Sequence, residues 1–203
     1  VPIICEMMGI TDPYVLYTDA DVIFVADVVQ DMSQMMPEYF AVCREANATD
    51  EQMNAGVLLL NRSKMLRTHS DFIAFIDANY NDQYDQYAYQ TFYANKYVWM
   101  DTKFNHRPYW GLTHASIIHY HGPKPYDIQE YIEKNEVRKI YKPIYASVDK
   151  SVWKAYYAKF YDICNMIPKF RFNTEIDSNF DWRIYLENYD DIRESGISTQ
   201  ASA

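Results

Sequence analysis

The sequence predicts an α/β domain followed by a helical C-terminal region. Short runs rich in β-branched and aromatic residues, typical of buried strands, alternate along the chain with longer segments whose apolar residues recur at helical spacing. The 203 residues suffice for one domain with a substantial core, whereas two full domains would need a longer chain. We expect this domain to occupy residues 1–145 and the helical region residues 146–203, with a further small module starting at about residue 178.

Composition and charge exclude several partners. The net charge is −9, so the chain lacks the basic surface that would follow a nucleic acid backbone or an anionic membrane. No apolar run approaches the ~20 residues that span a bilayer. The aromatic share of 17%, with 20 tyrosines, is high, and although most of these rings belong in the core, Tyr-rich surfaces often contact carbohydrate.

The three cysteines, Cys5, Cys43 and Cys164, lie far apart and show no CxxC spacing. This pattern argues against a disulfide framework and against a structural zinc site, so we expect reduced and mostly buried thiols. The N-terminus shows no charged segment leading into a signal-like apolar core. We therefore expect a soluble, cytoplasmic chain.

The first motif joins two short apolar strands. A Thr-Asp-Pro turn precedes a strand at residues 14–17, a second strand follows at residues 22–25, and Asp19 and Asp21 lie between them. Because residues at i and i+2 of an extended chain point to the same side, both carboxylates can bind one divalent cation. Such a cation neutralises a diphosphate and holds it as a leaving group. The alternative is a solvated acidic turn, which any short Asp-x-Asp motif also allows.

The remaining elements follow from local pattern and from turn signals. Before the first strand we expect a short helix that ends at Gly9. Downstream we expect, in order, a helical turn at 31–36, a strand at 39–43, a loop at 45–52, one or two helices over 63–80, a helix at 87–93, a strand at 98–100, a partly helical stretch at 126–145, and helices at 151–166 and 180–192.

The second motif is a turn of small residues, Asn54-Ala55-Gly56, leading into an apolar strand that stops at Asn61. A carboxamide at the mouth of this strand can both donate to and accept from vicinal sugar hydroxyls. Gly56 lets a ring come close to the backbone. The competing interpretation is that the three residues form nothing more than a turn.

Asp85 and Gln86 lie where a helical pattern starts. An acid is electrostatically favoured there, so Asp85 can be an N-terminal cap. In the functional interpretation the Asp85 carboxylate holds a hydroxyl of a sugar and Gln86 faces the anomeric carbon.

The third motif comes after an aromatic loop at residues 103–111, of the kind that shapes a carbohydrate pocket. A strand ends at His119, and a Gly-Pro turn at Gly122 then brings Lys124 toward phosphate. An imidazole beside two carboxylates favours Mn²⁺ over Mg²⁺. Taken alone, His119 is more often a hydrogen-bonded core or surface residue than a metal ligand.

In this order the motifs resemble glycosyltransferase family 8, the glycogenin-like and lipooligosaccharide galactosyltransferase-like enzymes of GT-A fold, over about residues 10–126. The resemblance implies a GT-A-like mixed sheet flanked by helices and a retaining, Mn²⁺-assisted (or Mg²⁺-assisted) transfer of a hexose. The donor would be a UDP-sugar and the acceptor a hydroxyl of a carbohydrate or glycoconjugate. It also implies site residues: Asp19, Asp21 and His119 for the metal, Asn54, Ala55, Gly56 and Asp85 for the sugar, Gln86 beside the reacting carbon, and Gly122 and Lys124 for the diphosphate.

The chain departs from the family pattern in two ways. Only Pro123 separates Gly122 from Lys124, where the family has two residues, and Tyr126 replaces a Trp. Only 18 residues precede Asp19, so we expect the N-terminal half that binds base and ribose to be missing, and the chain to be a fragment of a longer protein or inactive.

Two other functions stay open. A degenerate transferase domain could serve as a non-catalytic carbohydrate-binding or assembly unit. A metal-dependent phosphohydrolase could use Asp19, Asp21 and His119, but it would leave the sugar-binding motifs without a role.

Overall fold

The computed structural model describes residues 1–46, 51–79 and 85–166. The chain divides into a compact unit of residues Val1–Cys164 and a second unit of residues Asn165–Ala203. The predicted helix at 180–192 and the module expected near residue 178 lie outside the described residues.

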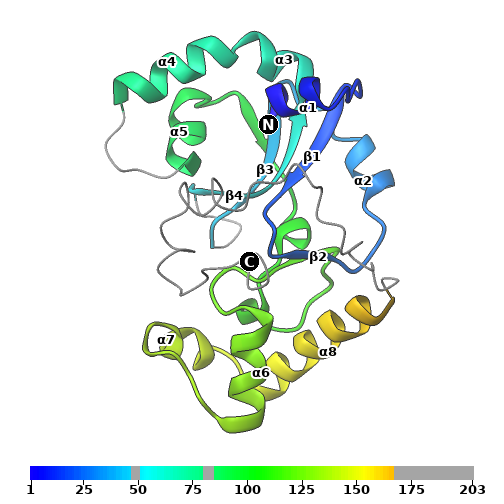
Figure 1. Cartoon of the computed structure of the whole chain (residues 1–203), viewed down its shortest axis with the longest axis vertical. Helices are drawn as coiled ribbons and strands as arrows, with labels where there is room; N and C mark the ends of the chain where they lie inside the picture. The colour runs from blue at the N-terminus through cyan, green and yellow to red at the C-terminus, as the bar shows by residue number, and fades with distance from the viewer. Residues whose placement is uncertain (47–50, 80–84, 167–203) are drawn as a thin grey trace, which may run out of the picture. The chain divides into compact units, whose positions relative to one another are not determined.

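A four-stranded mixed sheet forms the centre of the first unit (Figure 1). Its order is β1 (Tyr14–Thr18), β4 (Met53–Asn61), β3 (Phe40–Arg44) and β5 (Tyr97–Trp99). β4 runs antiparallel to both of its neighbours, whereas β3 and β5 are parallel. Because β4 is central, its residues are buried from Met53 to Leu60, which explains the unbroken apolar run after Gly56. The predicted α/β class with a mixed sheet is confirmed.

The expectation of a turn at Asn54-Ala55-Gly56 was wrong, because these residues belong to β4. The register between β3 and β4 shifts between Val42 and Cys43, so that the partner changes from Leu58 to Asn54. This irregularity accommodates the small residues within the strand instead of in a loop.

A second, two-stranded sheet pairs β2 (Val22–Phe24) antiparallel with β6 (Ile117–His119). Its register places Val22 opposite His119. This pairing joins the Asp-x-Asp motif to the third motif, which lies almost a hundred residues downstream.

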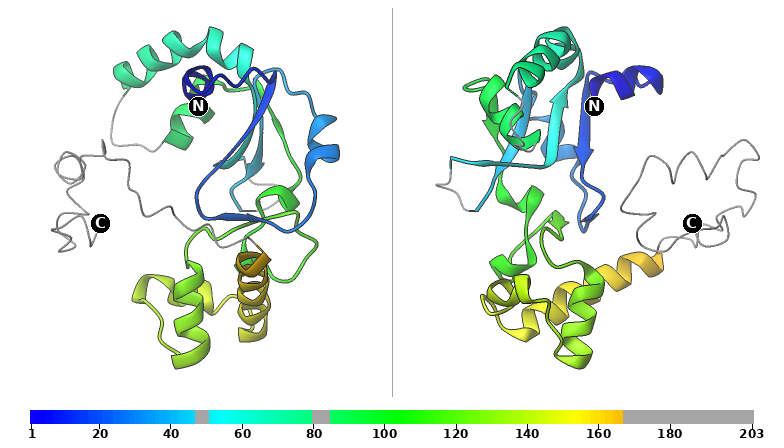
Figure 2. Two further views of the ribbon diagram at one scale, coloured as in Figure 1. Left: turned by 45° about the vertical axis from the view of Figure 1, so that its right-hand side comes forward. Right: turned by 60° about the vertical axis from the view of Figure 1, so that its left-hand side comes forward.

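Helices cover both faces of the large sheet (Figure 2). One core, which contains Phe40, Leu58 and Phe72, lies on one face of the sheet. A second core, which contains Val28 and Ile117, lies on the other face. The helices before β5 are α1 (Pro2–Met7), α2 (Val29–Ser33), α3 (Arg62–Arg67), α4 (His69–Asn79) and α5 (Asp85–Phe92). The predicted helix pair over 63–80 is confirmed, with Thr68 between its members.

The aromatic loop folds into two 3-10 turns, η1 (Thr102–Asn105) and η2 (Pro108–Trp110). After β6 come α6 (Pro125–Lys134), the turn η3 (Lys139–Tyr141), α7 (Lys142–Tyr145) and α8 (Lys150–Met166).

α8 shares a core with the rest of the first unit. Trp153 and Tyr156 are fully buried beside Ile118, Tyr120 and Ile128. The first unit extends to Cys164. The reason is that two large rings of α8 complete an apolar cluster built on β6 and α6.

Cys5 and Cys43 are buried free thiols, and Cys164 is an exposed one. No helix within residues 1–46, 51–79 and 85–166 is both long enough and apolar enough to cross a membrane.

We expect Trp153→Ala to lower the free energy of unfolding by about 3–5 kcal/mol, because a fully buried ring is removed. Tyr161→Ala, on the same helix but at a side chain that is 57% exposed, should change it by less than about 0.5 kcal/mol. Urea denaturation followed by circular dichroism measures both values. Equal effects of the two substitutions would contradict the packing of α8 into this core.

Candidate functional site

The structure brings Asp19, Asp21 and His119 together at the ends of three strands. Asp19 follows β1, and its backbone N–H donates to the carbonyl of Gly56 at 2.9 Å. Asp21 precedes β2, and its carbonyl accepts from the N–H of Tyr120, directly after β6, at 2.9 Å. One ligand atom from each of the three side chains lies within 4.8 Å of the other two. The positions predicted from the sequence therefore converge on one point.

The donor atoms suit a divalent cation. Nε2 of His119 lies 3.2 Å from Oδ1 of Asp21 and 3.8 Å from Oδ2 of Asp19. The His119 ring is buried, whereas both carboxylates are partly exposed, so a cation can reach the site from solvent. Two carboxylates and one imidazole form a donor set that Mn²⁺ accepts readily.

Two neighbours keep the Asp21 carboxyl ionised. Hydrogen bonding with His119, and further with Lys124, holds the pKa of Asp21 well below its ordinary value, although partial burial opposes this. The Lys124 ammonium donates to Oδ2 of Asp21 and, at 3.1 Å, to the carbonyl of Tyr120. Asp21 is thus available as an anionic ligand, and Lys124 places a positive charge beside the cation site.

The ring that lies against Gly56 in the structure is the imidazole of His119. A Cβ built on Gly56 would lie 2.3 Å from Cε1 and 2.7 Å from Nδ1 of His119, and 2.9 Å from Oδ1 of Asn54. Real side chains do not approach so closely, so only glycine at this position allows the imidazole to occupy its place.

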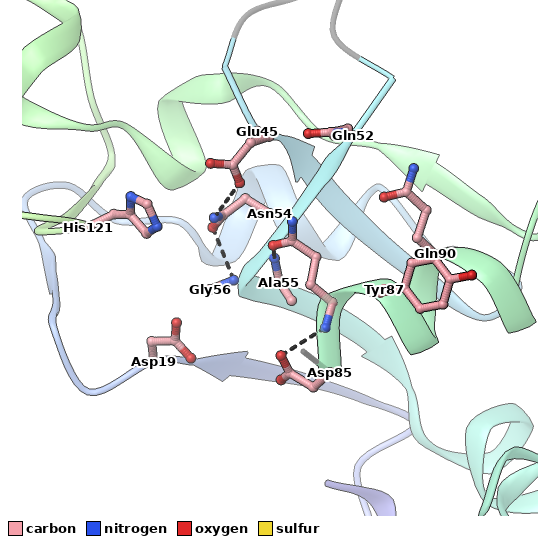
Figure 3. A pocket seen from close by; sticks show the side chains of 11 residues that line it. Asp19, Glu45, Gln52, Asn54, Ala55, Gly56, Asp85, Tyr87, Gln90 and His121 are labelled. Atoms are coloured by element: carbon pink, nitrogen blue, oxygen red, sulfur yellow. Dashed lines mark hydrogen bonds between the residues drawn. The ribbon is translucent and has the colours of Figure 1, made fainter. Parts of the chain in front are cut away.

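A cavity of about 720 Å³ opens beside the carboxylates (Figure 3). This size is in the range of small-molecule sites. Six predicted site residues line it, namely Asp19, Asn54, Ala55, Gly56, Asp85 and Gln86. Five lining residues were missed from the sequence, namely Glu45, Gln52, Tyr87, Gln90 and His121. They lie on loops or on the polar side of α5, where no local pattern distinguishes a cavity wall from a solvated surface.

Asp85 is the first residue of α5 and lines the cavity. Its carboxylate accepts from the N–H of Gln86 at 2.8 Å in the first turn of α5, and it also faces the cavity. Oε1 of Gln86 accepts from the N–H of Ala55 at 3.2 Å, which fixes α5 against β4. The helix start and the strand therefore form one continuous wall.

Asn54 has most of its side chain engaged within the protein. It is 4% exposed, and its Nδ2 donates to Oε2 of Glu45 at 2.8 Å. Its Oδ1 accepts from the N–H of Gly56 at 3.1 Å and from Nδ2 of Asn105 at 2.7 Å.

Neither Gly122 nor Lys124 is among the residues that line this cavity. Lys124 and Asp21 border a smaller cavity of about 410 Å³ whose walls include Tyr126 and Phe160. Gly122 has a φ of +90°, which favours glycine, and it turns the chain between His119 and Lys124.

The aromatic loop at residues 103–111 is mostly buried, and none of its residues lines the large cavity. Its contribution is polar: Asn105 contacts His119, and Arg107 pairs with Glu45 at 2.8 Å. The sequence pattern indicated aromatic rings in this loop and did not indicate these two polar residues.

Burial, followed by the charge of Arg107, lowers the pKa of the nearby His121 to about 4, so this cavity residue is neutral at pH 7.

The described residues form a mixed sheet flanked by helices, with two carboxylates at a strand end beside a cavity. No protein-family model matches the sequence, and no curated protein matches it. Among solved structures, the chain is similar to the glycosyltransferase GlyE of Streptococcus pneumoniae TIGR4, with 19% identity and a TM-score of 0.52 over 77% of this chain and 45% of GlyE. The apo form of GlyE gives 19% identity and a TM-score of 0.51 over 74% and 43% of the two chains.

A complex of the galactosyltransferase LgtC with donor and acceptor sugar analogues has 16% identity and a TM-score of 0.49, over 66% of each chain. At these identities the similarity to GlyE establishes the fold, and the chain has the fold of the GT-A glycosyltransferases. The chain spans less than half the length of GlyE.

We expect Gly56→Ala to weaken Mn²⁺ binding by at least about tenfold, because the new Cβ displaces the His119 ring. Gly9→Ala is the matched control: Gly9 has a φ of +69°, so alanine strains its backbone, but nothing lies within 4 Å of the added Cβ. Calorimetric titration with MnCl₂ measures both affinities. If Gly56→Ala binds Mn²⁺ as tightly as Gly9→Ala does, the close contact with His119 has no bearing on the cation.

Proposed function

We propose that this chain is a glycosyltransferase domain that transfers a hexose from a UDP-sugar to a hydroxyl of a carbohydrate or glycoconjugate acceptor. One observation carries the proposal: Asp19 groups with Asp21 and His119 and also lines a cavity large enough for a sugar. The GT-A fold supports it, as does the order of the motifs along the chain.

Asp19, Asp21 and His119 would hold the cation, and the imidazole favours Mn²⁺ over Mg²⁺. When bound, Mn²⁺ supplies charge neutralisation for the diphosphate oxygens. Lys124 adds a second positive charge at the same place, since it already contacts Asp21. We infer that the diphosphate lies between these groups.

The donor sugar would occupy the large cavity. Asp85 presents a carboxylate to its hydroxyls from the first turn of α5, and Ala55 and Gly56 present backbone from β4. Gln86 lies on the same wall, and we assign it to the side of the anomeric carbon.

We infer a retaining reaction. The bond from the anomeric carbon to the diphosphate oxygen breaks, and UDP keeps the electron pair. The acceptor oxygen then bonds to this carbon on the same face, and its proton passes to the departing diphosphate. Stabilisation of charge on UDP would supply most of the rate enhancement.

We expect the unaltered chain to bind Mn²⁺, and to bind UDP more tightly when Mn²⁺ is present. Asp21→Ala should abolish the Mn²⁺ dependence, because it removes a central ligand. Asp31→Ala is the control, since Asp31 lies on α2 and pairs with Lys103. Calorimetric titrations with MnCl₂ and then UDP give these affinities. Failure of the unaltered chain to bind Mn²⁺, or equal Mn²⁺ binding by Asp21→Ala, would overturn the proposal.

We expect Asp85→Ala to weaken binding of UDP-hexose by about tenfold or more while leaving the affinity for UDP within about twofold. A hydrogen bond to a charged group contributes about 1.5–3 kcal/mol, and UDP lacks the sugar that would make it. Asp71→Ala, in the first turn of α4, is the control. Competition titrations of UDP-glucose and UDP-galactose against UDP measure the ratio. An equal loss for UDP and for the sugar nucleotides would contradict the assigned role of Asp85.

A non-catalytic carbohydrate-binding or assembly unit is the second candidate function, since a cavity beside a cation site can bind a sugar nucleotide without transferring it. Hydrolysis or transfer of the UDP-sugar, assayed by release of UDP, separates the two candidates. Turnover supports the transferase, whereas sugar-nucleotide binding without turnover supports the binding unit.

A further inference from the structure

We propose that Glu45, Asn54 and Asn105 form a hydrogen-bonded relay that orients the His119 imidazole as a cation ligand. Within this relay the two asparagines are positioning residues and do not contact the cation themselves. The inference rests on the proposed function, because it explains the orientation of His119, which the proposed function assigns to the cation.

The relay starts at the Glu45 carboxylate. Arg107, whose side chain is 3% exposed, pairs with Oε1 of Glu45 at 2.8 Å. Burial raises the pKa of Glu45, but its hydrogen bond and charge interaction with Arg107 outweigh burial, and the pKa lies below its ordinary value. Glu45 is therefore an ionised carboxylate at neutral pH, and a carboxylate only accepts hydrogen bonds.

The orientation of the Asn54 carboxamide follows from its neighbours. The group that faces Glu45 must donate, so it is the NH₂ group, at 2.8 Å from Oε2. The backbone N–H of Gly56 only donates, so it must meet Oδ1 of Asn54, at 3.1 Å. Both constraints require the same orientation. In the opposite one, Oδ1 of Asn54 would face the Glu45 carboxylate and the NH₂ group would face the N–H of Gly56, so two acceptors and two donors would meet.

Asn105 passes this orientation on to His119. Oδ1 of Asn54 accepts from Nδ2 of Asn105 at 2.7 Å, which leaves Oδ1 of Asn105 toward the imidazole. That oxygen lies 2.8 Å from Nδ1 of His119, so Nδ1 must carry the proton and donate it. The other ring nitrogen, Nε2, is the atom that faces Asp19 and Asp21.

The relay therefore leaves Nε2 as the ring nitrogen whose lone pair can bind a cation, which replaces the proton that Nε2 donates to Asp21. Asn105 is fully buried and Asn54 is 4% exposed, so water does not compete for these bonds. Gly56 lies against Cε1 and Nδ1 of the same ring and limits its movement. Partners that hold the second nitrogen of a ligating histidine typically change metal affinity by 10- to 100-fold when they are removed.

A role in packing alone would not require this chemistry. Buried carboxamides destabilise a protein unless every polar atom finds a partner, and an apolar side chain of the same size could fill the space beside His119. The two asparagines instead satisfy one another in a single direction that ends on Nδ1 of His119.

The test is calorimetric titration of the full chain with MnCl₂. We expect Asn105→Leu, which fills the space but cannot accept from Nδ1, to bind Mn²⁺ about 10- to 100-fold more weakly. Asn105→Asp keeps an acceptor for Nδ1 but sets an oxygen against Oδ1 of Asn54, so it should bind Mn²⁺ less tightly than the unaltered chain and more tightly than Asn105→Leu. In a His119→Ala background, Asn105→Leu should change the affinity by less than about twofold, because the relay acts through the imidazole.

Asn61→Leu is the matched control. Asn61 lies at the opposite end of β4, and its carboxamide bonds to the N–H of Lys64 and the carbonyl of Pro37. This variant should lose stability without losing Mn²⁺ affinity. Thermal unfolding followed by circular dichroism, without Mn²⁺, shows which variants are folded.

Two results would overturn the relay alone: a folded Asn105→Leu variant that binds Mn²⁺ like the unaltered chain, or a loss that persists in full when His119 is already alanine. If Asn105→Leu does not fold, Asn105→Asp is compared with and without His119→Ala, and a loss that persists in full without the imidazole would count against the relay. If the unaltered chain itself binds no Mn²⁺, the proposed cation site fails and the relay fails with it.

Discussion

The antiparallel pairing of β2 with β6 is the constraint on which the site depends. It sets His119 opposite Val22 and thereby brings an imidazole from the third motif beside the carboxylates of the first. The pairing continues through the hydrogen bond from Tyr120 to the Asp21 carbonyl, which holds the acidic turn against the end of β6. Without this short ribbon the acidic pair would be an exposed turn, which is the alternative that the local sequence also allowed.

A second constraint comes from close approach. β4 is the central strand of the large sheet, and at Gly56 it carries no side chain, so the His119 ring can lie directly against its backbone. The same strand contributes Asn54 and Ala55 to the cavity wall. The central strand, the cation site and the cavity wall therefore share Gly56, so a substitution there would disturb the packing of all three.

Buried polar groups are unusually concentrated around this site. Asn54, Asn105, Arg107 and His119 are all at most 4% exposed, and an ion pair with Glu45 closes one end of their network. Desolvation of such groups costs free energy that apolar packing would not. Directed hydrogen bonds among Asn54, Asn105 and His119 offset much of this cost and give these three side chains one arrangement, whereas Nε and Nη2 of Arg107 have no hydrogen-bond partner among the described residues.

The sequence by itself determined the α/β class and most of the strands and helices, because these depend on local periodicity. It also indicated Asp19, Asp21 and His119 as candidate ligands at strand ends, which the structure brings close together. Only the tertiary structure decided that Asn54, Ala55 and Gly56 lie within a strand, that α8 belongs to the first unit, and that Asn105 and Glu45 reach the site. Each of these depends on a partner far away in the chain: β3 for β4, the β6 and α6 core for Trp153, and His119 for Asn105. Local pattern carries no information about such partners, because burial and hydrogen bonding between distant segments are settled only when the chain folds.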